Sequence, residues 1–294
     1  MRSFLFVPAD SAKKLDKAMT SGADALIVDL EDSIALDGKA RARQSAAAFL
    51  REAMAAANRP YLLVRVNGLQ TGLTDADLDA IAPARPDAIM LPKAEGGAAV
   101  THADAKLAVR EALSGLPDGQ IKILPIATET AAALFLVGTF AGASARLIGL
   151  TWGAEDLSAE LGAHANRDSQ GRFLDPYRLA RALCLAGAAA TQVPAIDTVY
   201  VDFRDQPGFR RECENACRDG FTGKMAIHPA QVPIINEVFT PTAATLARAQ
   251  AIVDAFAQSP GAGVVGIGGL MYDRPHLARA QRLLEAVKTP APQG

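Results

Sequence analysis

The sequence has little of several features that mark whole classes of protein. It holds three cysteines in 294 residues, and aromatic residues make up only 5% of the chain. Thirty basic and 32 acidic side chains leave a formal net charge of −2. Three cysteines cannot form a framework of several disulfides, and the balanced charge disfavours binding to nucleic acid through a general positive field. We therefore expect a reducing environment and no nucleic-acid partner.

Long apolar runs are also missing. No run approaches the ~18 residues that a membrane span needs. The apolar run at the N-terminus ends at Val7 and is soon followed by Asp10, Lys13 and Lys14, which is atypical of a signal peptide. We therefore expect a cytoplasmic protein with no membrane partner.

The sequence does have short apolar runs that alternate with stretches of helical period. Such alternation is typical of βα units around a parallel sheet, and runs this apolar indicate strands buried on both faces. Eight runs favour a closed (β/α)₈ TIM barrel over an open doubly wound sheet. The eight predicted strands are Phe4–Val7, Ala25–Leu30, Tyr61–Val66, Ala88–Leu91, Ile121–Ala127, Arg146–Thr151, Ile196–Val201 and Lys224–Ile227.

More chain follows the eighth run than a barrel needs, so we divide the sequence into a barrel domain, residues 1–240, and a C-terminal helical extension, residues 241–294. Helical period covers Pro241–Gln258 and returns within Met271–Val287. Between them Ser259–Gly269 is rich in glycine, without the Lys-Ser/Thr of a phosphate loop. This segment is either a mobile lid or a plain hairpin that packs on the barrel.

Polar residues collect at the carboxyl ends of the predicted strands, where barrel enzymes place their chemistry. Glu129 and Asp156 follow consecutive strands and are 27 positions apart, about one βα unit. Two neighbouring carboxylates with open positions suit Mg²⁺ better than Zn²⁺, which prefers imidazole and thiolate. Glu31 and Asp32 could hydrogen-bond the water molecules of that metal ion. The alternative for any single acid is helix capping, by Asp156 or Glu155 at the helix that starts near Leu157 and by Asp32 at the turn before the next helix.

Arg65 ends the third run and has the planar fork that pairs with a substrate carboxylate or carbonyl oxygen. Its alternative role is an ion pair that balances the nearby acids. Lys93, which follows the fourth run, is a second candidate substrate contact. His228 follows the eighth run beside a proline and is more typical of a structural hydrogen-bonding residue than of an acid or base.

These residues resemble the citrate lyase β-subunit-like branch of the HpcH/HpaI aldolase superfamily, which includes relatives of malyl-CoA and citramalyl-CoA lyases. The similar segments run in the family's order over nearly the whole chain. They are Arg2–Asp10, Gly22–Asp32, Arg65–Asn67, Met90–Lys93, Glu129–Thr130, Trp152–Leu157 and Ala226–Gln231.

The resemblance implies a barrel with a C-terminal extension, assembled as a homotrimer or hexamer. Glu129 and Asp156 match the Mg²⁺ ligands of the family, Arg65 matches the arginine that holds the substrate, and Glu31 and Asp32 match acids around the metal. The segment with Lys13 is similar to the part that meets coenzyme A. Asp273 lies in a motif similar to one whose aspartate enters a neighbouring subunit's site as the acid or base, although Leu270 departs from that motif.

The implied activity is Mg²⁺-dependent cleavage or formation of a β-hydroxyacyl-CoA thioester, with an acyl-CoA and a 2-oxo acid as the other partners. Four alternatives stay open: a citrate lyase β subunit acting on an acyl-carrier-protein thioester, a class II pyruvate aldolase acting on free hydroxy-oxo acids, an acyl-CoA thioesterase, and a non-catalytic binding subunit. Malyl, citramalyl and citryl groups differ too little for the sequence to choose between them, because one methylene contributes only ~1–3 kcal/mol.

Overall fold

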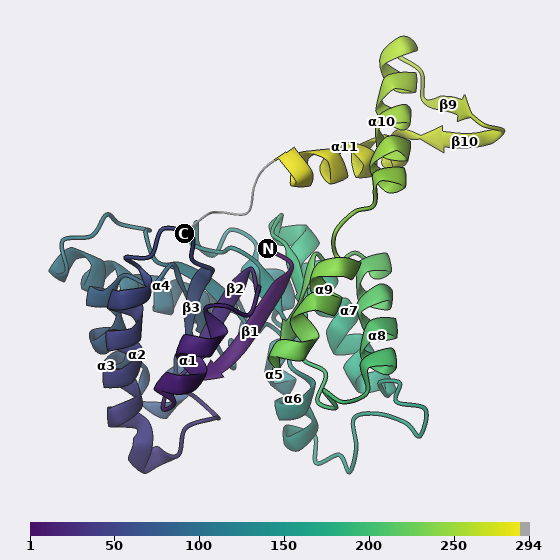
Figure 1. Ribbon diagram of the computed structural model, residues 1–294. Helices are drawn as coiled ribbons and strands as arrows, with labels where there is room; N and C mark the ends of the chain where they lie inside the picture. The colour runs from purple at the N-terminus through teal and green to yellow at the C-terminus, as the bar shows by residue number, and fades with distance from the viewer. Residues whose placement is uncertain (289–294) are drawn as a thin grey trace. The chain divides into compact units, whose positions relative to one another are not determined.

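The computed structural model describes residues 1–288, in which eight parallel strands form one sheet (Figure 1). The sheet order is β5-β4-β3-β2-β1-β8-β7-β6. Isolated bridges from Ile123 to Leu147 and from Ile126 to Thr151 join the two ends, so the sheet is a nearly closed barrel. The predicted TIM-barrel class is therefore confirmed. The strands are β1 (Ser3–Pro8), β2 (Ala25–Asp29), β3 (Tyr61–Arg65), β4 (Ala88–Leu91), β5 (Lys122–Pro125), β6 (Leu150–Thr151), β7 (Ala195–Asp197) and β8 (Gly223–Ala226).

Helices follow the strands and cover the outside of the barrel (Figure 1). The α-helices of this unit are α1 (Ala12–Ala18), α2 (Lys39–Ala53), α3 (Thr74–Ile81), α4 (Gly96–Leu113), α5 (Ala131–Leu134), α6 (Ala154–Glu160), α7 (Asp175–Thr191), α8 (Gln206–Asp219) and α9 (Val232–Val238). Short 3₁₀ turns include η4 (Val137–Phe140) and η5 (Pro229–Gln231). Among the described residues, no helix combines the length and apolar character needed to cross a membrane.

Seven of the eight barrel strands contribute to two apolar cores, because successive side chains point to opposite faces. On β2, Leu26 and Val28 pack in the core between strands and helices, whereas Ala25 and Ile27 pack in the smaller core inside the barrel. Both faces are buried, which explains why the strands are continuous apolar runs rather than alternating ones.

Three strands are clearly shorter than predicted, among them β5, which covers Lys122–Pro125 instead of Ile121–Ala127. The ladder of β6 covers only Leu150–Thr151, and β7 ends at Asp197 instead of Val201. Thr198 and Val199 turn to line a cavity, and Val201 is exposed. The β-branched residues in these runs have the propensity of strands, but beyond the short β6 they lack a neighbouring ladder to pair with.

A second compact unit begins at Thr240. It contains α10 (Ala243–Gln258), the antiparallel hairpin of β9 (Val264–Ile267) and β10 (Leu270–Asp273), and α11 (Arg274–Lys288). Gly268 and Gly269 form the hairpin turn with φ of 57° and 79°, the left-handed conformation that two-residue hairpins need. The glycine-rich segment thus includes a β-hairpin. The second compact unit has its own apolar cluster, which includes Ile252, Phe256 and Tyr272.

Candidate active site

A cavity of about 340 Å³ lies at the carboxyl ends of the barrel strands. Its wall includes four of the side chains predicted from the sequence, Asp32, Arg65, Glu129 and Asp156, together with Trp152. Glu31 and Lys93 contact these residues directly. The structure thus brings together six of the eight predicted site residues.

The register of β2 and β3 sets the position of Arg65. Its strand partner is Asp29, and both residues end their strands. The Arg65 guanidinium donates from Nε and Nη2 to the two Asp29 carboxylate oxygens, each at 2.7 Å. Burial opposes the charge of Asp29, but Arg65 holds the pKa of that carboxyl below its usual range. Arg65 therefore forms an ion pair with Asp29, and its third guanidinium nitrogen, Nη1, is left for other partners.

That remaining Nη1 of Arg65 lies 2.9 Å from Oε2 of Glu31 and 3.6 Å from Oδ2 of Asp32. The backbone amides of Glu31 and Ser33 donate to Asp29, which fixes the loop after β2. Glu31 is buried, and its burial raises the pKa of the carboxyl. One aspartate therefore orients both the arginine and the loop that carries the two acids.

Lys93 links two of the acids, Glu31 and Asp156. Its ammonium lies 2.7 Å from Glu31 Oε1 and 3.1 Å from Asp156 Oδ1. Its backbone has φ of 50°, a conformation that is rare outside glycine, and its amide donates to Glu129 Oε2 at 2.7 Å. The strained turn after β4 thus provides one cation and one amide to three carboxylates.

The burial and charge around Glu129 and Asp156 are compatible with a bound magnesium ion. Burial raises the pKa of the Glu129 carboxyl, and the nearby negative charge of Asp156 raises it further. Gly153 leaves room for this carboxylate, since a Cβ there would lie 3.1 Å from Glu129 Oε1. Within residues 1–288 no group of three or more His, Cys, Asp or Glu side chains could hold a metal. Two carboxylates with open positions match the coordination that Mg²⁺ accepts.

Helix capping does not account for Asp156. Helix α6 begins at Ala154 with Gly153 as its N-cap, and Asp156 lies in the first turn without a capping hydrogen bond from that position. The acid is only about one third exposed and faces Lys93. His228, in contrast, accepts a hydrogen bond from the Ala230 amide and caps η5, which is the structural role expected from the sequence.

The two remaining predicted residues lie outside this cluster. Lys13 is exposed on α1 and does not line the cavity. Asp273 ends β10 in the second compact unit, where its carboxylate contacts His276.

Sequence reasoning missed two residues that support the site. Asp29 ends an apolar run, and its position opposite the last residue of the next strand was a usable signal. Lys39 is buried at the start of α2, and its ammonium donates to the backbone carbonyls of Leu30 and Glu31 at 2.7 Å each. Nothing in the sequence pattern distinguishes this lysine from the exposed residues of the same helix.

The chain matches the family model described as HpcH/HpaI aldolase/citrate lyase over residues 2–229, and it belongs to that family. It is therefore a member of a lyase family. A (3S)-malyl-CoA thioesterase of Cereibacter sphaeroides is 36% identical over 96% of this chain and 93% of its own. The citrate lyase subunit beta of Leuconostoc mesenteroides is 33% identical, and the match covers 97% of this chain and 92% of that protein.

Solved structures agree with these relatives. The CitE protein of Mycobacterium tuberculosis, in complex with magnesium, acetoacetate and coenzyme A, superposes with a TM-score of 0.78 at 32% identity. The match covers 98% of both chains.

Proposed function

We propose that this protein is a magnesium-dependent carbon–carbon lyase that cleaves or forms a β-hydroxyacyl-CoA thioester. The products of cleavage are an acyl-CoA and a 2-oxo acid. The observation that supports this most is the grouping of two carboxylates, Glu129 and Asp156, with the Arg65 guanidinium around one cavity. Relatives whose names include citrate lyase and citramalyl-CoA lyase support the same chemistry.

Glu129 and Asp156 would hold the ion. Magnesium bound there supplies Lewis-acid polarisation of the carboxylate and carbonyl oxygens of the 2-oxo acid. Arg65 stabilises negative charge that develops on the carbonyl oxygen, and Asp29 keeps its guanidinium in position. Glu31 and Asp32 would accept hydrogen bonds from water bound to such an ion. Lys93 balances the charge of the acids and contacts the substrate.

Two further roles belong to this proposal. Asp273, supplied by the hairpin of a neighbouring subunit in a trimer or hexamer, exchanges the α proton of the acyl-CoA. Lys13 contacts the coenzyme A portion. Closure of the hairpin over the cavity would exclude water and strengthen the contacts to the reacting atoms.

Thioester hydrolysis is the second candidate, because a relative at 36% identity is named as a malyl-CoA thioesterase. The two activities differ in whether water reaches the acyl carbonyl. They also differ in products, since hydrolysis releases free coenzyme A and cleavage alone does not.

A substrate panel distinguishes the candidates. The purified protein is assayed with Mg²⁺ against (S)-malyl-, (S)-citramalyl- and (S)-citryl-CoA, with 2-oxo acid and free thiol followed separately. We expect release of a 2-oxo acid that EDTA abolishes. Free thiol instead would identify a thioesterase, and no product from any thioester would favour a carrier-protein thioester or a free-acid substrate.

A further inference from the structure

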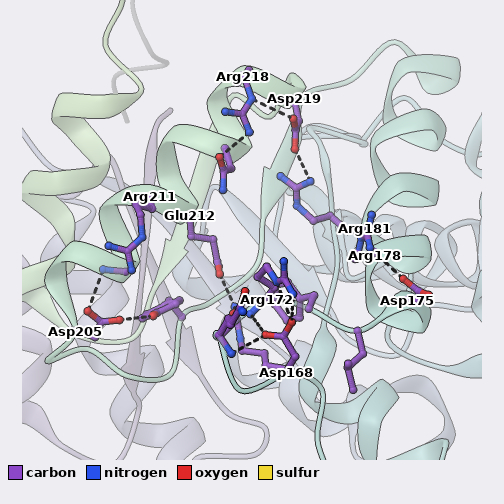
Figure 2. Close-up of a pocket in the computed structure, with 18 residues that line it drawn as sticks. Asp168, Arg172, Asp175, Arg178, Arg181, Asp205, Arg211, Glu212, Arg218 and Asp219 are labelled. Carbon is purple, nitrogen blue, oxygen red and sulfur yellow. Dashed lines mark hydrogen bonds and ion pairs between the residues drawn. The ribbon is translucent and has the colours of Figure 1, made fainter.

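A second cavity lies on the outer wall of the barrel, between α7, α8 and the loop before α7 (Figure 2). Its volume is about 870 Å³, and it shares no lining residue with the active-site cavity. Five acidic residues and six arginines line it; the arginines are Arg167, Arg172, Arg178, Arg181, Arg211 and Arg218. We call it the arginine groove.

Three of these arginines are exposed to solvent. The side chains of Arg172, Arg178 and Arg218 are 70–72% exposed. Arg178 pairs with Asp175, which is itself 91% exposed. An exposed ion pair contributes only ~0–1 kcal/mol, so a ligand with several negative charges can replace such a partner at small cost. These guanidiniums are therefore available to a bound anion.

The other side of the groove is anchored. The Arg167 guanidinium lies 3.6 Å from the ring centroid of Phe173 and pairs with Glu212 at 2.6 Å. Arg181 pairs with Asp219 at 2.7 Å and lies 3.4 Å from Asp197. The groove thus combines fixed and adjustable guanidiniums, which suits phosphate or carboxylate groups.

A buried network connects the groove to the wall of the active site. Lys224 is fully buried and pairs with Glu212 at 2.9 Å and with Asp197 at 2.7 Å. Asp197 also accepts a hydrogen bond from the Trp152 indole at 2.8 Å. Trp152 lines the active-site cavity just before the helix that carries Asp156. Glu212 in the groove is therefore connected, through the buried Lys224 and Asp197, to Trp152 in the active-site cavity.

We propose that the arginine groove binds a small multivalent anion bearing phosphate or carboxylate groups, and that this binding is transmitted to Trp152 through Asp197. This site is independent of the proposed reaction. An anion that binds Arg218 competes with Asp219, which also pairs with Arg181. Because Arg181 lies 3.4 Å from Asp197, this changes the charges around Asp197 and so the hydrogen bond to the indole.

Trp152 is the one tryptophan of the chain, so its fluorescence reports changes around this indole. The metal-free protein is titrated with inorganic triphosphate and, separately, with citrate, and heat is measured by calorimetry alongside fluorescence. We expect saturable binding of at least one anion with a change in Trp152 emission. Saturation by triphosphate alone identifies a phosphate ligand, and saturation by citrate alone a carboxylate ligand.

Variants place the binding in the groove. In the double variant Arg178→Ser/Arg218→Ser, we expect the anion to bind about tenfold more weakly or worse, because two charge-assisted contacts are lost. The control Arg41→Ser/Arg51→Ser removes the same charge from exposed positions of α2 and keeps the affinity. Arg65→Ala, in the other cavity, also keeps it.

Three results would overturn the proposal. If neither anion gives a binding heat, the groove is not an anion site. If the α2 control weakens anion binding as much as the groove variant does, the effect is one of general charge. Heat without a change in fluorescence removes the connection to Trp152.

Discussion

Asp29 shows how one residue can support a site without touching the reacting atoms. Its carboxylate binds Arg65 through two hydrogen bonds and also accepts two backbone amides of the next loop. We expect Asp29→Asn to lower kcat by tenfold to a hundredfold while Mg²⁺ affinity stays close to native, because the arginine loses its orientation but the metal ligands do not. Steady-state kinetics with a Mg²⁺ titration check this, and Asp37→Asn at an exposed position is the control. A loss of Mg²⁺ affinity instead would place Asp29 with the metal.

The same pair predicts a pH dependence of stability. The pKa of Asp29 is lowered in the folded protein, so its stabilisation is present above its unfolded value near 3.8 and is lost as the pH falls through the folded pKa. Loss of one partner of a buried pair costs about 3 kcal/mol. We therefore expect Asp29→Asn to be destabilised by about that amount at pH 7, and the difference to shrink as the pH falls below about 4. Urea unfolding across this range measures it; a difference independent of pH would contradict the assignment.

The metal assignment depends on Glu129 and Asp156. We expect Glu129→Gln and Asp156→Asn each to weaken Mg²⁺ binding and to lower kcat by about 10²–10³, because each removes one of two anionic ligands. Glu160→Gln, exposed on the same helix as Asp156, should retain both properties. Native Mg²⁺ affinity and turnover in both variants would show that the metal binds elsewhere.

At the scale of the element, close packing of α4 against η4 depends on the absence of a side chain. A Cβ on Gly97 would lie 2.1 Å from the Thr139 carbonyl oxygen. We expect Gly97→Ala to destabilise the protein by about 1–3 kcal/mol, since backbone must shift to admit the methyl group. Gly138→Ala in η4 meets nothing within 4 Å and serves as the control. Equal unfolding midpoints for the two variants in denaturant would refute the packing argument.

Elements also show how far the sequence could be interpreted. All eight strands were predictable from apolar runs, because parallel strands buried on both faces leave a strong pattern. The end of β7 was not, since Val199 and Val201 have strand propensity but lie beyond the ladder, and the start of β6 was not, since its ladder begins only at Leu150. The site residues that follow strands were predictable because the carboxyl ends of barrel strands meet at one end of the barrel. The contact from Lys93 to Asp156 joins residues 63 positions apart, and no local pattern encodes such a distance.

At the scale of the whole molecule, the proposed role of Asp273 requires more than one chain. If the hairpin of one subunit completes the cavity of another, Arg65→Ala and Asp273→Ala should each be inactive alone. Coexpressed in one oligomer, they should recover a measurable fraction of native activity, because some cavities combine an intact Arg65 with an intact Asp273. The measurement is turnover of copurified, differently tagged chains. Activity that stays at the level of the single variants would remove this role from the mechanism.

The barrel is joined least extensively between β5 and β6, where isolated bridges stand in place of a continuous ladder. Glu129 follows β5 and Asp156 follows β6, so the two carboxylates stand on opposite sides of that seam. An ion shared between them would act as a clamp, and substrate binding would become coupled to the local opening of the wall. The amides that cross the seam, those of Ile123, Ala127 and Ile148, should then exchange with deuterium more slowly once Mg²⁺ is present. Binding of the ion at the active site and closure of the barrel between β5 and β6 would then occur together.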